Sequence, residues 1–293
     1  MTTNRTFQGI LPAVVTPLDA DERFAERPYE ALLARIYQAG SHGIYVCGQT
    51  GEGLLQTVEQ RKRVAEVSMA VSPRDKQVIV HVGSHRTADA VELTRHANGL
   101  GVAAVSALPP FGPYPFSEIR AYYEAIAAAA EVPVLVYYFP EISPAIQKIE
   151  QILELLEIPN VAGLKFTDFD LYKMRILKQA GAVVYNGRDE ILAAGMLMGA
   201  DGGIGTFYNV MPELFVAVYD CAQRGDWDGA RAAQDKIVAA IRTILRFPLF
   251  PAIKQILAWS GIDCGPCIRP RVALTAEQTA ALRTAWKGLS VTV

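Results

Sequence analysis

Eight short apolar runs alternate with helix-length segments along most of the chain, and this alternation constrains the fold more than any other feature. The runs are GILPAVVT, GIYVC, QVIVHVG, VAAVSAL, VPVLVYY, VAGLKF, AVVYNG and DGGIGT. Each is followed by good helix formers or by apolar residues at helical spacing, as in PYEALLARIYQAG. Because parallel strands need a crossover between them, strict alternation predicts a parallel sheet. Eight such units predict an α/β fold, the closed (β/α)8 TIM barrel.

An open, doubly wound sheet is the alternative for an alternating chain. That fold would favour a GxGxxG motif after the first strand, and LPAVVTPLDADERF has none. After about residue 224 the pattern changes to three helical stretches with no strand between them, DWDGARAAQDKIVAAIRTILRF, PAIKQILAWSG and TAEQTAALRTAWKGL. We therefore expect a barrel catalytic domain over residues 1–224 and a C-terminal helical extension over residues 225–293, packed on the barrel.

Composition limits the kinds of partner. The chain has 293 residues, 51% of them hydrophobic, and a formal net charge of -2 without a long run of one sign. This balance favours small-molecule substrates over nucleic acid or a membrane surface. The opening MTTNRTFQGI lacks the apolar core of a signal peptide, and with only four cysteines we expect reduced thiols and a cytoplasmic protein.

The tetrad CGPC, Cys264 to Cys267, has the spacing of thioredoxin-type redox motifs. That chemistry needs the pair at a helix N-terminus after a strand in an early βαβ unit. Here the tetrad lies near the C-terminus with no strand visible before it, so we interpret it as a turn between two helices. No second CxxC, nearby histidine or HExxH motif completes a metal ligand set, and we predict no metal site.

Lys165 lies inside the apolar run VAGLKF, one residue from its end. Burying an isolated ammonium costs on the order of several kcal/mol, and desolvation favours the neutral amine. A neutral amine can attack a ketone and form a Schiff base. From the run alone, a lysine that reaches solvent at the barrel rim or pairs with an acid is the plainer interpretation. Tyr137, at the end of the neighbouring run, favours the Schiff base, because a phenol beside the imine can move the proton of an aldol cleavage.

The loop GQTGEG follows the second apolar run. Its three glycines let the backbone approach a ligand closely. Its N–H groups precede a helix and form a candidate anion pocket for a small carboxylate. Thr50 is a candidate relay that passes a proton to Tyr137. Taken alone, the loop is equally consistent with a tight strand-to-helix turn.

Together, GQTGEG, VYYFPEIS, GLKFTD and YNGRDEILAAGMLMGADGGIGTFYN resemble the N-acetylneuraminate lyase / dihydrodipicolinate synthase family of class I aldolases. The resemblance runs from about Gly9 to about Arg271 and is greatest to the lyase branch. It implies a pyruvate Schiff base on Lys165, with Tyr137 as proton shuttle and Thr50 as relay, and no cofactor. The backbone of Gln49 and Thr50 would hold the pyruvate carboxylate.

The same resemblance implies a second group of substrate-binding residues, which would contact the sugar chain: Thr167, Gly187, Asp189, Glu190 and Thr206. The last is a threonine where the family has serine. Family members are commonly tetramers in which a tyrosine from the loop after the fourth strand reaches a neighbour's site. Tyr114 is the candidate here, in a loop one residue longer than usual, and we expect a homotetramer.

Four positions depart from the family pattern. Gln49 stands where Ser or Thr is usual, Arg188 replaces a frequent tyrosine of the lyases, and Glu141 replaces a small apolar residue. Ile142 occupies the position where the synthases carry an arginine for aspartate semialdehyde, and an apolar side chain cannot replace a guanidinium. We therefore expect a lyase that cleaves or condenses N-acetylneuraminate or a related 2-keto-3-deoxy sugar acid. A 4-hydroxy-tetrahydrodipicolinate synthase and a non-catalytic 2-oxo-acid-binding barrel are the alternatives.

Overall fold

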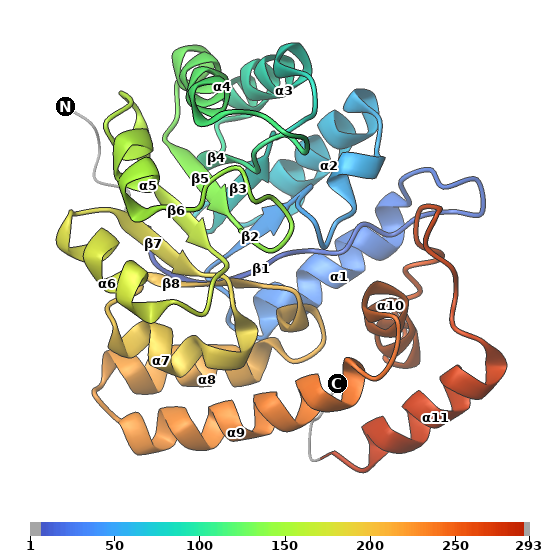
Figure 1. The fold of residues 1–293 in the computed structure, drawn as a ribbon. Helices are drawn as coiled ribbons and strands as arrows, with labels where there is room; N and C mark the ends of the chain where they lie inside the picture. The colour runs from blue at the N-terminus through green and yellow to red at the C-terminus, as the bar shows by residue number, and fades with distance from the viewer. Residues whose placement is uncertain (1–6, 290–293) are drawn as a thin grey trace.

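Eight parallel strands form one sheet at the centre of the computed structural model, which describes residues 7–289 (Figure 1). The opening MTTNRT, on which the expectation about a leader segment partly rests, lies outside these residues. The sheet order is β1-β8-β7-β6-β5-β4-β3-β2. The strands are β1 (Gly9–Pro12), β2 (Gly43–Val46), β3 (Gln77–His81), β4 (Ala104–Ala107), β5 (Val134–Tyr138), β6 (Val161–Phe166), β7 (Val183–Asn186) and β8 (Gly202–Gly205).

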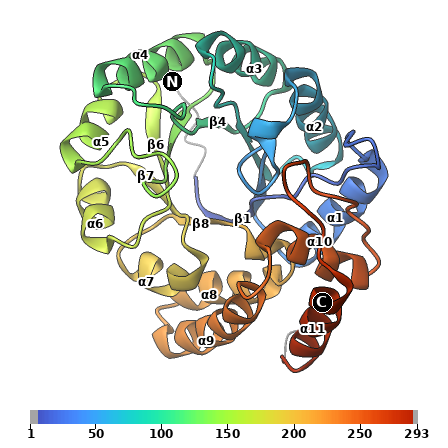
Figure 2. The same ribbon diagram turned by 45° about the vertical axis from the view of Figure 1, so that its right-hand side comes forward.

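The sheet closes between its first two strands. Ala13 and Tyr45 form an isolated parallel bridge, and the Val14 N–H donates to the Tyr45 carbonyl at 2.9 Å. A ring of helices surrounds the strands (Figure 2), and the predicted (β/α)8 barrel is confirmed. The ring contains α1 (Glu26–Gln38), α2 (Val58–Val71), α3 (Thr87–Leu100), α4 (Phe116–Ala129), α5 (Ile149–Leu156), α6 (Leu171–Gln179), α7 (Leu192–Leu197) and α8 (Pro212–Gln223).

The first strand is shorter than its apolar run predicts, because a side chain replaces a neighbouring strand beyond Pro12. The Asn209 amide nitrogen donates to the Ala13 carbonyl at 2.7 Å. Its amide oxygen accepts from the Val15 N–H at 3.1 Å. The Asn209 side chain therefore satisfies two backbone groups of this segment that no neighbouring strand pairs.

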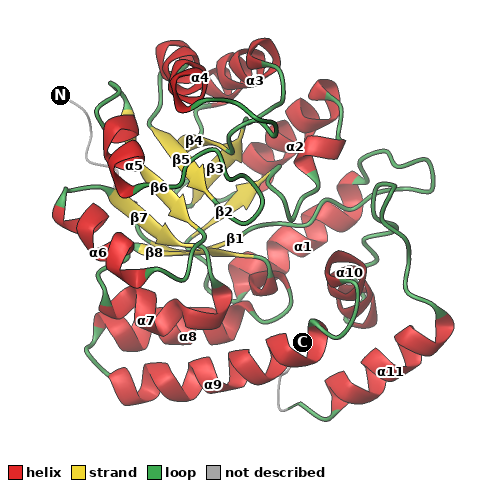
Figure 3. Cartoon of the chain, in the orientation of Figure 1, coloured by secondary structure: helices red, strands yellow, loops and turns green. Residues whose placement is uncertain are grey.

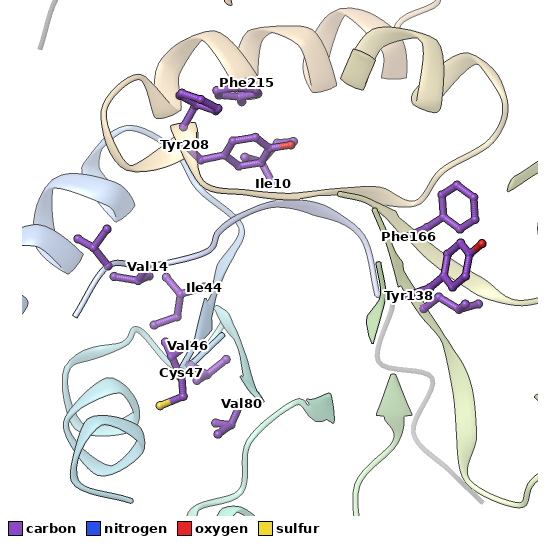
Figure 4. Packing of buried hydrophobic residues seen from close by; sticks show 14 of the residues in the cluster. Ile10, Val14, Ile44, Val46, Cys47, Val80, Tyr138, Phe166, Tyr208 and Phe215 are labelled. Carbon is purple, nitrogen blue, oxygen red and sulfur yellow. The ribbon is translucent and has the colours of Figure 1, made fainter. Parts of the chain in front are cut away.

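Alternating strand residues divide the core into two parts, as the period of two requires. One part lies between strands and helices and includes Tyr138 and Phe166, whose ring centroids are 5.3 Å apart (Figure 4). The other fills the barrel interior and includes Leu135 and Tyr137. Lys165 is in register with Tyr137 across the β5–β6 pair. The lysine therefore shares the interior side of the sheet with Tyr137.

The chain ends in three helices with no strand among them, α9 (Trp227–Ile244), α10 (Leu249–Trp259) and α11 (Ala276–Lys287), as predicted (Figure 3). Helix α9 runs alongside α8, and α10 lies beside α1 (Figures 1 and 2). Whether the chain divides into units at residues 224 and 225 stays a prediction. No helix within residues 7–289 is long and apolar enough to cross a membrane.

The CGPC tetrad forms part of the connection between α10 and α11, as predicted. Cys264 and Cys267 are both free thiols. Burial raises the pKa of Cys264 to about 12 and that of Cys267 to about 11. Reactive thiols of redox motifs have lowered pKa values, so the structure favours the turn interpretation.

Candidate active site

Lys165 is buried among aromatic rings near the end of β6. The residue is 4% exposed, and its Nζ lies 4.0 Å from the Tyr137 ring centroid and 4.7 Å from that of Tyr45. Burial lowers the pKa of Lys165 to about 7, and the nearby Asp189 carboxylate opposes this shift. The ammonium group therefore does not reach solvent at the rim. A large share of this amine is unprotonated near neutral pH.

A cavity of about 390 Å³ opens beside Lys165 at the carboxyl ends of the strands. Every substrate-binding or catalytic residue predicted from the sequence, apart from Tyr114, lines it: Gln49, Thr50, Tyr137, Lys165, Thr167, Gly187, Asp189, Glu190 and Thr206. These residues come from strand ends and loops spread over more than half of the chain. They meet because the carboxyl ends of all eight parallel strands face the same mouth.

Tyr137 faces the lysine from the neighbouring strand. The residue is 3% exposed. Burial raises the pKa of its phenol well above the usual value, and the Thr167 hydroxyl opposes this rise. The Thr167 oxygen is itself buried and makes no hydrogen bond of good geometry to the described residues. It is therefore a polar group in the cavity that remains free for a ligand.

The loop GQTGEG forms a tight turn after β2. The Glu52 N–H donates to the Gln49 carbonyl at 3.1 Å, and the Gly53 N–H donates to the Gly48 carbonyl at 3.0 Å. A Cβ at Gly53 would lie 1.8 Å from the Cys47 oxygen, so only glycine fits there. The Thr50 hydroxyl is 2.7 Å from that of Thr206.

This contact bears on the proton relay predicted for Thr50. It joins the loop after β2 to the end of β8, so the Thr50 hydroxyl is already paired with Thr206. The relay to Tyr137 stays a prediction.

Asp189 is a buried acid of the cavity, in the short helical turn that follows β7. Its Oδ2 accepts from the Phe207 N–H at 2.8 Å, which fixes the carboxyl group against the turn after β8. Burial raises the pKa of Asp189 to about 7, and the Phe207 hydrogen bond works against that rise. Lys165 and Asp189 thus both titrate near neutral pH within one cavity. Such shifts gather at functional sites.

Part of the cavity wall was not foreseen from the sequence. Its apolar members are Phe139, Ile204, Phe207, Leu245, Leu249 and Phe250. Leu245 directly follows α9, and Leu249 and Phe250 begin α10, so the C-terminal extension reaches the mouth. No sequence signal pointed to these residues; in the structure, Leu245 is 52% exposed although it is apolar.

Arg188 occupies the rim of the same cavity. Its guanidinium lies 4.3 Å from the Phe169 ring centroid and 5.2 Å from that of Phe139, and it pairs with Glu141. The Nε atom is buried and has no hydrogen-bond partner among the described residues. Two of the departures from the family pattern, Arg188 and Glu141, therefore form one ion pair.

Two further residues, Tyr114 and His81, lie outside the cavity lining. Tyr114 lies on the loop before α4 and is 39% exposed, so its predicted reach into a neighbour's site stays a prediction. His81 is a buried core residue and accepts from the Leu108 N–H at 3.0 Å. Within residues 7–289, no group of three or more His, Cys, Asp or Glu side chains is placed to hold a metal ion.

A (β/α)8 barrel whose mouth holds a buried lysine of lowered pKa has the architecture of a class I aldolase. The model of the dihydrodipicolinate synthetase family matches residues 6–288, and the chain belongs to this family. The match extends beyond both ends of the resemblance seen in the motifs.

The chain is similar in sequence to curated lyases and in structure to solved lyases. The N-acetylneuraminate lyase of Rhizobium meliloti (strain 1021) is 38% identical over 95% of this chain and 94% of its own length. The wild-type sialic acid aldolase of Ruminococcus gnavus superimposes with a TM-score of 0.89 at 31% identity, covering 97% of this chain and 100% of its own. The N-acetylneuraminate lyase of Proteus mirabilis superimposes with a TM-score of 0.90 at 30% identity, covering 98% of this chain and 100% of its own.

Proposed function

We propose that this protein is a pyruvate-dependent class I aldolase, a carbon–carbon lyase that cleaves N-acetylneuraminate or a related 2-keto-3-deoxy sugar acid to pyruvate and an aldose. The observation that carries the proposal is the buried Lys165, whose pKa is lowered to about 7 inside the cavity. The curated relatives named N-acetylneuraminate lyase support this choice of substrate.

In the proposed reaction, the neutral Lys165 amine adds to the C2 ketone of the sugar acid, water leaves, and the resulting imine takes up one proton from solvent, which gives a protonated imine. The C3–C4 bond then breaks, and its electron pair moves into the imine as the C4 hydroxyl loses its proton. The aldose departs, and the resulting enamine takes a proton at C3. Water finally hydrolyses the imine to pyruvate and the free amine.

Tyr137 is assigned the proton at the C4 hydroxyl. Its ring lies 4.0 Å from Lys165 Nζ, so its phenol is beside the imine. Because burial raises the pKa of Tyr137, the phenol holds its proton at neutral pH. The phenol can therefore take the proton of the C4 hydroxyl while it gives its own proton away. Thr50 is the proposed relay for that proton.

The two ends of the substrate would bind different groups of residues at the mouth. Backbone groups of Gln49 and Thr50, in the turn before α2, are assigned the pyruvate carboxylate. Carboxylates accept hydrogen bonds and suit hydroxyl groups. The residues assigned to the sugar chain are Thr167, Gly187, Asp189, Glu190 and Thr206, and all of them line the cavity.

Condensation with aspartate semialdehyde is the competing reaction within this family. It would need a cation for a second carboxylate, and the apolar Ile142 lines the cavity instead. Arg188 is a cation at the rim, but Glu141 already neutralises it. The lining therefore favours a polyhydroxy substrate.

The proposal includes the setting of the enzyme. We expect a cytoplasmic homotetramer without a cofactor, in which Tyr114 of one subunit reaches a neighbour's cavity. The exposure of Tyr114 is compatible with that contact. Measuring the mass of the particle in solution tests the assembly directly.

Reductive trapping tests the mechanism. Borohydride added with pyruvate should attach a reduced pyruvyl group to the peptide that contains Lys165, because the reagent reduces the imine to a stable amine. Lys173 serves as an internal control, since it is a lysine of the following helix that pairs with Asp168 and Asp170. An adduct on another lysine, or none, would contradict the Schiff-base mechanism and favour a non-catalytic barrel.

A further inference from the structure

Glu52 is a carboxylate buried between the loop after β2 and the C-terminal extension. Its side chain is 0% exposed. Its backbone has φ of 57°, in the left-handed region that residues with side chains rarely adopt. A buried acid in an unfavourable backbone conformation persists only where its surroundings hold it there, and such sites often serve function.

The polar partners of this carboxylate belong to the extension. Lys254 of α10 is 3% exposed, and its Nζ lies 3.1 Å from Oε2. The Ile268 N–H donates to Oε1 at 3.0 Å, and Arg271 Nη1 lies 3.5 Å from Oε1. Lys254 also donates to the Pro266 carbonyl at 2.5 Å. One buried cluster thus joins segments that are 216 residues apart in sequence.

The backbone of Glu52 belongs to the turn that is assigned the pyruvate carboxylate. Its N–H donates to the Gln49 carbonyl at 3.1 Å. The peptide groups of Gln49 and Thr50 lie within this short hydrogen-bonded turn. A displacement of Glu52 therefore reorients those peptide groups, even though the Glu52 side chain points away from the substrate toward the extension.

We propose that Glu52 is a positioning residue, and that its buried link to Lys254 and Ile268 sets the affinity of the loop for the pyruvate carboxylate. This inference rests on the proposed function, because it concerns the carboxylate site of that reaction. The C-terminal extension is then part of the catalytic unit in two ways. It lines the mouth through Leu249 and Phe250, and it holds the loop after β2 through Glu52.

A paired substitution separates positioning from folding. Removing one partner of a buried ion pair leaves an uncompensated charge, whereas replacing both by neutral groups of similar size is often tolerated. The variant Glu52→Gln/Lys254→Met should therefore fold and unfold at a temperature close to that of the original protein. In the same variant, the pyruvate concentration that half-saturates borohydride trapping at Lys165 should rise about tenfold, the scale of one lost hydrogen bond to a charged group. The trapped fraction at saturating pyruvate should stay the same.

Two arginines of the same segment provide a matched comparison. Arg271 contacts Glu52, while Arg269 pairs with the barrel residue Glu22 at 2.8 Å and is 86% exposed. Arg271→Gln should raise the half-saturating concentration by about twofold to threefold, because Arg271 is partly exposed and such a partner contributes less than a buried one. Arg269→Gln should leave it unchanged.

The outcomes separate this inference from the proposed function. If the original protein forms no adduct at Lys165, both are overturned. If it forms the adduct and the folded paired variant keeps the same half-saturating concentration, only the positioning role of Glu52 is overturned. Should the paired variant not fold, an unchanged half-saturating concentration in Arg271→Gln gives the same negative result.

Discussion

At the scale of single residues, Lys165 shows how burial alone prepares a nucleophile. Its pKa is lowered from 10.5 to about 7 because the charged form loses its hydration. The fraction of neutral amine consequently falls as the pH drops below about 7. This is the opposite of a rim lysine, which would stay charged throughout the physiological range.

The pH dependence of imine formation follows from this shift. The initial rate of trapping with pyruvate should fall roughly tenfold per pH unit below the Lys165 pKa and level off above it. Rapid-quench borohydride trapping across this range, followed by mass spectrometry, measures that rate. A rate that keeps rising toward the usual lysine pKa of about 10.4 would show that the amine is not desolvated in solution.

Tyr137 and Tyr138 are adjacent phenols on opposite sides of β5, and they make a matched pair. Tyr137→Phe should lower kcat for sugar-acid cleavage by about a hundredfold, the usual scale for a positioned acid–base group. Imine trapping with pyruvate should persist, because the lysine is untouched. Tyr138→Phe should turn over normally, since its hydroxyl faces Asp168 at 3.3 Å, outside the cavity lining. If Tyr138→Phe lost activity and Tyr137→Phe did not, the proton transfer would belong to Tyr138.

At the scale of elements, α11 is stabilised at its start by a capping box. The Thr275 hydroxyl accepts from the Gln278 N–H at 3.1 Å, and the Gln278 side chain accepts from the Thr275 N–H at 3.0 Å. The helix buries Leu282 and Trp286 against the rest of the molecule. It does not line the cavity, so its stability and the chemistry should be separable.

Thr275→Ala should cost about 1 kcal/mol of stability, because the Gln278 N–H loses the hydroxyl that accepts its hydrogen bond. For a chain of this size the unfolding temperature should drop by roughly 2 °C, with kcat and KM unchanged. Calorimetry together with steady-state kinetics measures both. Thr279→Ala, one turn further along the helix, is the control and should have little effect. An equal loss in both variants would mean that the cap is not formed.

At the scale of the whole molecule, the chemistry of the mouth decides which aldehyde the enzyme uses. Ile142 offers no charge to a second carboxylate, while Asp189 and Glu190 place two acids beside the cavity. The value of kcat/KM for cleavage of N-acetylneuraminate or a related sugar acid should therefore exceed that for condensation of pyruvate with aspartate semialdehyde. Parallel assays of both reactions on one preparation make the comparison. A preference for the semialdehyde would identify a synthase and contradict the reading of Ile142.

The sequence by itself determined the barrel, the extension and most of the cavity lining. Short apolar runs and helical segments are local patterns, and eight alternating units leave few ways to bury all apolar faces. The strand ends then predict which residues meet, because parallel strands direct their carboxyl ends to one mouth. Lys165 was also recognisable from the sequence, because it is a charged residue inside an apolar run.

Only the tertiary structure decided the contacts that cross the chain. Glu52 reads as an ordinary loop acid in GQTGEG, yet its partners Lys254 and Ile268 come from the far end of the sequence. The same holds for Leu245, which reaches the cavity from the extension. Such contacts depend on how whole elements pack, and no local period or spacing encodes them.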